Sequence, residues 1–137
     1  MTTPETLLRL VAYDGLATAA TAEGREWPDP DPQTTQMVRQ MLSDIANGVK
    51  DSPRMTQGMR DLAAEPDVPP TIASVLKGLK SFSFLGREDV QKQGIDRRGA
   101  KVSRIYNYKL VLEQGVVYVE ICLAVDGKVA DLTPYNE

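Results

Sequence analysis

Residues 101–134 alternate between apolar and polar side chains, a pattern typical of a β-sheet with one buried and one exposed face. Two glycine-containing pairs, Gln114-Gly115 and Asp126-Gly127, interrupt the alternation, and Asp-Gly is a strong signal for a two-residue hairpin turn. The segment therefore predicts three antiparallel strands, at about 101–112, 116–125 and 128–134. Alternation over 80–90 predicts a fourth strand, and the polar residues 91–100 predict a loop.

The register of the first hairpin can be tested by the side chains that it pairs. With Gln114-Gly115 as a two-residue turn, Tyr108 pairs with Ile121 and Lys109 pairs with Glu120. Apolar side chains then meet each other, and opposite charges meet each other. A three-residue turn would place Glu120 beside Tyr108 and mix the two faces, so the two-residue turn is the predicted one.

The second hairpin continues the same two faces. With Asp126-Gly127 as a two-residue turn, Leu123 pairs with Ala130 and Tyr118 pairs with Tyr135. The apolar face is then made of Tyr106, Tyr108, Leu110, Leu112, Val117, Val119, Ile121, Leu123, Ala130 and Leu132. The opposite, mixed face is made of Asn107, Lys109, Val111, Tyr118, Glu120, Cys122, Val129, Asp131, Thr133 and Tyr135.

The first half of the chain carries apolar residues at helical spacing. The clearest helix is predicted to begin at a Thr34 or Thr35 cap and to end at Asn47-Gly48. Its apolar stripe is formed by Met37, Val38, Met41, Leu42 and Ile45. Residues 55–64 repeat the pattern, and a further helix is predicted over 71–79 after a group of prolines.

The helical stripes and the apolar sheet face must be buried, and packing them together buries both. The predicted fold class is therefore α+β, with N-terminal helices on one face of a curved four-stranded antiparallel meander. Residues 34–137 are predicted to form this domain. Residues 1–33 are predicted to hold an N-terminal helix, which begins at Thr3-Pro4, and a proline-rich connector over 24–33.

The composition excludes several classes of function. The chain has 137 residues, a net charge of −3 and no histidine. Without histidine there is no histidine metal site, no Ser-His-Asp triad and no Cys-His nucleophile. The negative charge argues against nucleic-acid binding, and no apolar run approaches the roughly 18 residues of a membrane span. We therefore expect no metal, no cofactor, and neither a nucleic acid nor a membrane as partner.

The single cysteine and the N-terminal residues bear on the compartment. Cys122 cannot form an internal disulfide, and we expect it to pack half-buried in a strand, with no cation close to it in sequence to lower its pKa. The N-terminus lacks the basic start and apolar stretch of a secretory signal. A cytoplasmic protein is the default expectation, and a secreted or periplasmic one is expected if the chain is a fragment of a longer hydrolase.

Four stretches carry a resemblance to a known family: Phe82-Ser-Phe-Leu-Gly-Arg-Glu-Asp, the glycine-containing loop after it, Val102-Ser-Arg-Ile-Tyr-Asn-Tyr-Lys-Leu, and Leu123-Ala-Val-Asp-Gly-Lys-Val-Ala. Over 34–134 the chain resembles nuclear-transport-factor-2-like domains, which have a cystatin-like α+β fold. It looks most like the small domains that follow the hydrolase domain in some bacterial serine-hydrolase (beta-lactamase-like) proteins. The resemblance implies either an accessory domain without catalysis or an enzyme similar to ketosteroid isomerases and polyketide cyclases.

In the enzymes of that family, a carboxylate or histidine base and tyrosine donors line a pocket between helices and sheet. Here Tyr106, Tyr108 and Arg104 lie on the predicted helix-facing side, where phenols and a guanidinium suit an anionic or carbonyl ligand. The alternative is that the tyrosine rings only pack. Glu88 is the one strand carboxylate predicted on the apolar side, or else it is solvated. Trp27 is a candidate lid or partner anchor, or a linker side chain docked on its own domain.

The predicted function is that of a non-catalytic accessory domain that binds a protein or a small apolar molecule, and that is associated with a serine hydrolase. The alternative is a small-molecule enzyme of the ketosteroid-isomerase or polyketide-cyclase type, which needs a carboxylate in a buried cleft. The mixed face exposes more apolar area than a solvated sheet face does, so a homodimer or docking to a neighbouring domain is expected. The interface candidates are Tyr118, Glu120, Lys109, Val129 and Tyr135.

Overall fold

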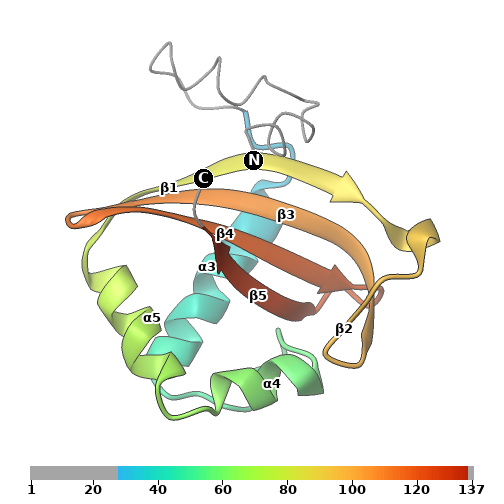
Figure 1. Cartoon of the computed structure of the whole chain (residues 1–137), viewed down its shortest axis with the longest axis horizontal. Coiled ribbons are helices and arrows are strands. Elements are labelled where there is room, and N and C mark those ends of the chain that lie inside the picture. The colour runs from blue at the N-terminus through green and yellow to red at the C-terminus, as the bar shows by residue number, and fades with distance from the viewer. Residues whose placement is uncertain (1–27, 136–137) are drawn as a thin grey trace.

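Residues 28–135 are the part of the chain that the computed structural model describes, and they form three helices and a five-stranded antiparallel sheet. The helices are α3 (Pro32–Ala46), α4 (Gln57–Ala63) and α5 (Val68–Lys77). The strands are β1 (Leu79–Asp89), β2 (Asp96–Arg97), β3 (Ala100–Leu112), β4 (Gly115–Ala124) and β5 (Val129–Tyr135). The helices all lie on one side of the sheet (Figure 1). The predicted α+β class and antiparallel sheet are confirmed.

The strands follow one another in the sheet in the order β1-β3-β4-β5, and the short β2 pairs with the beginning of β3. The four predicted strands thus form the meander. The fifth strand comes from residues 91–100, which the sequence analysis predicts as a loop. Those residues form a short 3-10 turn, Gln91–Gln93, and then β2. Arg98 and Gly99 join β2 to β3 with φ values of +50° and +82°, as in the two-residue turns that suit a twisted hairpin.

Two helices begin earlier than predicted, and proline is the reason in both cases. Pro32 is the first residue of α3, Asp31 is its N-cap, and neither Thr34 nor Thr35 is the cap. Pro69 lies in the first turn of α5, which begins at Val68 and not at residue 71. A proline in the first turn lacks only an N–H group that has no partner within the helix, so it does not prevent the helix from starting.

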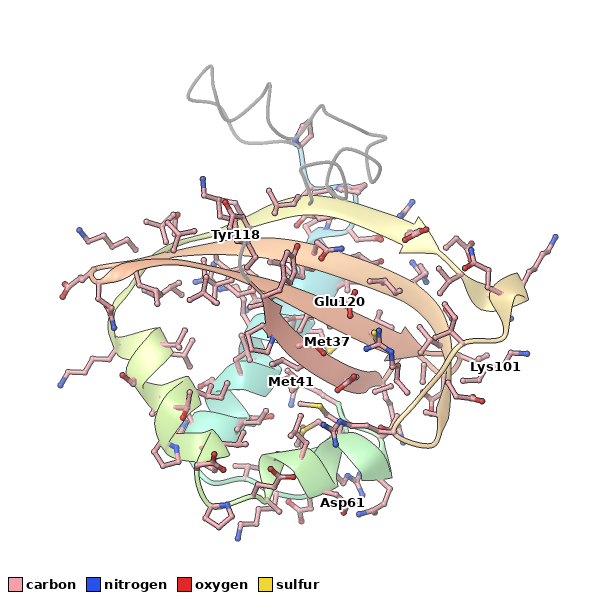
Figure 2. The ribbon with its side chains drawn as sticks, viewed as in Figure 1. Met37, Met41, Asp61, Lys101, Tyr118 and Glu120 are labelled. Carbon is pink, nitrogen blue, oxygen red and sulfur yellow. The ribbon has the colours of Figure 1, made fainter. Side chains whose placement is uncertain are left out.

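The core lies between the helices and the inner face of the sheet. Val38, Met41, Leu42 and Ile45 of α3 are buried, and Met37 packs beside them, so the predicted stripe is confirmed. Figure 2 labels Met37 and Met41 on the helix side of the sheet. From the strands the core takes Tyr106, Tyr108, Leu110, Leu112, Val119, Ile121, Leu123 and Val129. Burial of these side chains is the main favourable contribution to folding.

The first hairpin has the predicted faces but not the predicted pairs. Tyr108 pairs with Val119, and Glu113-Gln114 form the turn in place of Gln114-Gly115. The pairing is therefore shifted by two residues. A shift of two keeps every side chain on its face, so the apolar pattern cannot distinguish the two registers. The turn is fixed from outside the hairpin, since the Glu113 N–H donates to the carbonyl oxygen of Gly78 at 2.9 Å.

The second hairpin has the predicted register along most of its length. Tyr118 pairs with Tyr135 and Ile121 with Leu132, as predicted, but Leu123 pairs with Val129 and not with Ala130. The loop has three residues, because the Ala124 N–H donates to the Lys128 oxygen at 2.8 Å. A bulge next to Leu123 then restores the register.

This bulge changes the face on which Val129 lies. Val129 is predicted from the sequence to lie on the mixed face, as an interface candidate, and this prediction is wrong. Its side chain is completely buried in the core against the helices.

A bulge in β1 has a similar effect. The pairing with β3 shifts between Phe84 and Gly86, so Arg87 lies opposite Tyr106 and Glu88 lies opposite Ile105. The prediction that Glu88 shares the apolar side of this strand is therefore wrong. Glu88 is exposed, and the bulge brings Arg87 to Tyr106 instead.

Candidate functional site

The carboxylate of Asp31 meets three donors that project from the sheet. The hydroxyl of Tyr106 donates to Asp31 Oδ2 at 2.5 Å, and the guanidinium of Arg87 donates to the same oxygen. Arg104 Nη1 lies 3.5 Å from Oδ2 and donates to the Tyr106 hydroxyl oxygen at 3.0 Å. One carboxylate from the residue before α3 thus holds two strands, β1 and β3, through three side chains.

A second set of hydrogen bonds lies beside the first. The hydroxyls of Tyr108 and Thr35 are 3.0 Å apart, and Thr35 donates to Asp29 Oδ2 at 2.5 Å. The other oxygen of Asp29 accepts from the backbone N–H of Asp31 at 2.8 Å. We call these residues the phenol cluster: Asp29, Asp31, Thr35, Arg87, Arg104, Tyr106 and Tyr108.

The two tyrosines are positioned by the core. Both side chains are completely buried, and their rings are almost parallel, with centroids 6.4 Å apart. Phe82 packs against the Tyr108 ring at a centroid distance of 4.9 Å. Apolar packing therefore holds the rings, while the hydroxyls meet polar partners at the start of α3, as is usual for buried tyrosine.

Asp31 is available to the sheet because it does not cap its own helix. It is the N-cap residue of α3 by position, but its side chain makes no capping hydrogen bond. The following residue, Pro32, disfavours helical backbone at Asp31, whose φ and ψ are −135° and 66°. The side chain consequently reaches the sheet and not the free N–H groups of the helix.

The electrostatics of the phenol cluster favour a charged Asp31. The hydrogen bond from Tyr106 lowers the pKa of Asp31 below its ordinary 3.8; burial works against this, and Arg87 adds to it. The pKa of Tyr108 is raised, chiefly because burial disfavours its phenolate. Asp31 is therefore an ionised acceptor at neutral pH, and Tyr108 is a neutral phenol.

Three of the five predicted pocket residues meet here. Tyr106, Tyr108 and Arg104 lie in the phenol cluster, Glu88 lies on the other side of the sheet, and Trp27 lies outside the described residues. Four members are not among the residues predicted from the sequence: Asp29, Asp31, Thr35 and Arg87. The two aspartates alternate with prolines just before the clearest predicted helix. This position next to a helix end is the one signal in the sequence that could have found them.

The mixed face carries a second polar cluster, built around Asp131. Arg97 Nη1 and Arg98 Nε donate to its two carboxylate oxygens at 2.9 and 2.8 Å. Arg97 Nη2 also lies 3.2 Å from Glu120 Oε1. The predicted Lys109–Glu120 pair is wrong, since Lys109 lies opposite Tyr118 and makes no ion pair with another residue of 28–135.

Cys122 lies beneath this cluster. It is buried, in a small apolar group with Val90, Val102, Ile105 and Ile95. Burial, with a smaller contribution from Glu120, raises the pKa of the thiol to about 12. The prediction of a packing cysteine is confirmed, but the side chain is fully buried and not half-buried, and Arg97 is a cation near it. The thiolate form that would react is still strongly disfavoured.

The rest of the mixed face is not covered by a described helix. Tyr118 and Tyr135 stack with ring centroids 5.7 Å apart, and the Tyr135 hydroxyl donates to Asn107 Oδ1 at 2.8 Å. Figure 2 shows Tyr118 and Glu120 on β4. We call this surface the outer face; it consists of Ser81, Ser83, Asn107, Lys109, Val111, Val116, Tyr118, Glu120, Thr133 and Tyr135.

Metal sites and membrane spans are two further possibilities that the structure addresses. Within residues 28–135, no three cysteine or carboxylate side chains come together in a way that could hold a metal ion. None of the helices in that part of the chain has the length and apolar character that crossing a membrane requires.

Comparison with known proteins adds no family. Scans of the chain against protein-family models, against curated proteins and against solved structures each returned no match.

Proposed function

We propose that this protein is a non-catalytic interaction module with a cystatin-like, nuclear-transport-factor-2-like fold, which binds another protein surface through its outer face. The order of elements supports the fold, since helices precede a curved antiparallel meander and cover one side of it. The resemblance to accessory domains of bacterial serine hydrolases suggests a hydrolase as the neighbour in the native protein.

The observation that carries this proposal is the state of Asp31. An enzyme of the isomerase or cyclase type needs a carboxylate that can exchange a proton with a substrate. Among residues 28–135, Asp31 is the carboxylate that contacts a buried tyrosine directly, and it accepts hydrogen bonds from Tyr106 and Arg87. Those partners lower its pKa and so weaken it as a base. The phenol cluster is thus arranged to hold the chain together more than to move protons.

The composition of the outer face supports the second half of the proposal. Two stacked tyrosines and two valines surround a lysine and a glutamate, and Val116 is 44% exposed. Aromatic side chains around a few charges are typical of protein interfaces. Lys109 and Glu120 lie two positions apart in the sheet register. Across a two-fold axis, each lysine can face the glutamate of a second copy, which Arg97 of its own chain also contacts, so a homodimer is the expected assembly.

The assembly can be tested by light scattering of the wild type and Tyr118→Asp at matched micromolar concentrations. We expect a dimeric wild type and a monomeric variant, because an unpaired charge buried in an interface is strongly unfavourable. Val49→Asp is the matched control, since Val49 is 38% exposed beside the end of α3 and should leave the dimer intact. A monomeric wild type, or a Tyr118→Asp variant that stays dimeric, contradicts the homodimer.

The alternative of an enzyme has one observation in its favour, which is that a carboxylate does lie beside two buried tyrosines. Steroid-enone isomerisation, ester hydrolysis and nitrocefin turnover are direct assays for the classes that the resemblance suggests. We expect no turnover in any of them. Turnover that Asp31→Asn abolishes and Asp44→Asn leaves unchanged would overturn the non-catalytic proposal.

A further inference from the structure

We propose that Arg87, Arg104 and Tyr106 form a binding niche for an oxyanion, and that the carboxylate of Asp31 occupies it in place of a ligand. The ligand class is a small molecule with a carboxylate or phosphate group. This niche lies on the helix side of the sheet, so it is separate from the outer face.

The donor set is the first argument. Arg87, Tyr106 and Arg104 all approach one oxygen, Asp31 Oδ2, and Tyr106 does so at 2.5 Å and Arg104 at 3.5 Å. Guanidinium groups present planar sets of donors that match carboxylate and phosphate oxygens, and they stay charged at any physiological pH. Two of them with a buried phenol between them make a site for an oxyanion.

The charge balance is the second argument. Two guanidinium groups face the niche, and among residues 28–135 the one carboxylate that forms an ion pair with either of them is Asp31. The carboxylate of Asp29 is occupied by Thr35 and by the Asp31 N–H group. With Asp31 absent, the niche would therefore hold two positive charges without an ion-pair partner in the described chain.

The accessibility of the niche is the third argument. The side chains of Arg87 and Arg104 are 40% and 42% exposed, and that of Asp31 is 26% exposed. A dissolved anion can therefore reach the two arginines. Because the Asp31 side chain makes no capping hydrogen bond, its departure removes no hydrogen bond from α3. A ligand oxyanion that replaces the Asp31 carboxylate again gives Arg87, Arg104 and Tyr106 an acceptor, and it leaves α3 unchanged.

The test is to remove the internal carboxylate and offer an external one. Asp31→Ala in the full chain is titrated with inorganic phosphate and, separately, with acetate, against sodium chloride at matched ionic strength. The measurements are the side-chain NMR signals of the arginines and the thermal midpoint. We expect phosphate to bind Asp31→Ala at least ten times more tightly than the wild type, and to raise its midpoint more than chloride does. The acetate arm shows whether a carboxylate suffices.

Two further variants make the result specific. Asp44→Ala removes a carboxylate that pairs with the single guanidinium of Arg54 at 3.1 Å, so it leaves one arginine exposed and not two. We expect no phosphate effect beyond that of chloride in this variant. Adding Arg87→Ala to Asp31→Ala should abolish the gain in phosphate binding. The Tyr118→Asp variant should bind phosphate as the wild type does, so failure of the dimer proposal and failure of this one are distinguishable.

Equal phosphate binding by Asp31→Ala and wild type overturns the proposal, and so does equal binding by Asp31→Ala and Asp44→Ala. If Asp31→Ala does not fold in chloride, folding on addition of phosphate supports the niche. The proposal is contradicted if Asp31→Ala also fails to fold in phosphate and a folded Asp31→Asn variant binds phosphate no more tightly than the wild type does.

Discussion

The hydroxyl of Tyr106 donates to the carboxylate of Asp31 at 2.5 Å, across 75 positions of sequence. This contact joins the residue before α3 to the middle of β3. Because the Tyr106 ring is fully buried and the hydroxyl is not needed for ring packing, Tyr106→Phe removes this hydrogen bond and the one that the hydroxyl accepts from Arg104, and leaves the ring packed. We expect it to reduce the free energy of unfolding by about 1.5 to 3 kcal/mol, the usual contribution of a hydrogen bond to a charged group.

A double-mutant cycle with Asp31→Asn measures that contact directly. Denaturant unfolding of the two single variants and the double variant should give a coupling of about 0.5 to 2 kcal/mol between the two positions. Tyr108→Phe is the matched control, because its hydroxyl is paired with Thr35 and not with Asp31. If Tyr108→Phe couples to Asp31→Asn as strongly as Tyr106→Phe does, the contact is not the source of the coupling.

Acid should destabilise the fold through two aspartates. Asp31 has a lowered pKa because of Tyr106 and Arg87. For Asp131, burial alone would raise the pKa, but the hydrogen bonds from Arg98 and Arg97 outweigh it and lower the pKa. The stability that each lowered pKa contributes is fully present above the ordinary value of 3.8 and is lost as the pH falls through the folded value. The free energy of unfolding should therefore be constant near pH 6 and fall below about pH 4.

The variant Asp131→Asn separates the two groups. It should be less stable than the wild type at pH 6, because Arg97 and Arg98 lose the carboxylate that they share. Its stability should also change less between pH 6 and pH 3, which urea unfolding at a series of pH values measures. An acid dependence as steep as that of the wild type would show that Asp131 does not contribute to it.

Gly58 should not tolerate a side chain. A Cβ atom added at Gly58 would lie 2.1 Å from the backbone oxygen of Arg98, and backbone cannot turn aside as a flexible side chain can. Gly58→Ala must therefore move α4 away from the turn that Arg98 begins, at a loss of about 1 to 3 kcal/mol in thermal or urea unfolding. Gln57→Ala, one position earlier in the same helix and exposed, serves as control and should change stability by less than about 0.5 kcal/mol. Equal stability of the two variants would contradict this close contact.

Cys122 should be unreactive while the protein is folded. Its pKa of about 12 leaves almost no thiolate at pH 8, and the side chain is buried. A thiol reagent such as Ellman's reagent should label it at least a hundred times more slowly in buffer than in denaturant. Arg97→Ala removes a nearby cation that lowers the pKa of the thiol. We expect this variant to be labelled more slowly than the wild type only if the 91–100 segment stays in place. Rapid labelling of the folded wild type would mean that this segment opens readily.

At the turns, the structure differs from what the sequence predicts. Alternation along the strands predicted the two faces of the sheet, and the structure confirms them from Tyr106 to Ile121. The register of the first hairpin was missed by two residues because such a shift leaves the faces unchanged. The contact that fixes it, from Glu113 to Gly78, joins the hairpin to the end of α5 and has no signature in the local sequence.

The candidate site was predicted in part for a similar reason. Tyr106, Tyr108 and Arg104 are on one strand, so their shared neighbourhood follows from strand periodicity alone. Arg87 entered the site through the bulge after Phe84, which moved Glu88 away at the same time. A bulge inserts one residue and reverses the alternation beyond it. Gly86 lies at this shift, and an isolated glycine within a strand is a signal for a bulge, but it does not specify which side chains the bulge brings together.

Residue type and a periodicity of two or 3.6 residues were sufficient to predict the α+β class, the stripe of α3 and the inner face of the sheet, and the lack of histidine excluded histidine chemistry. Contacts formed in the folded chain set the partner of Asp31, the side on which Val129 and Glu88 lie, and the covering of Cys122 by the 91–100 segment. Those features depend on one-residue bulges and on contacts between distant segments, and the free energy that selects them comes from packing and pairing that exist once the helices and the sheet have met.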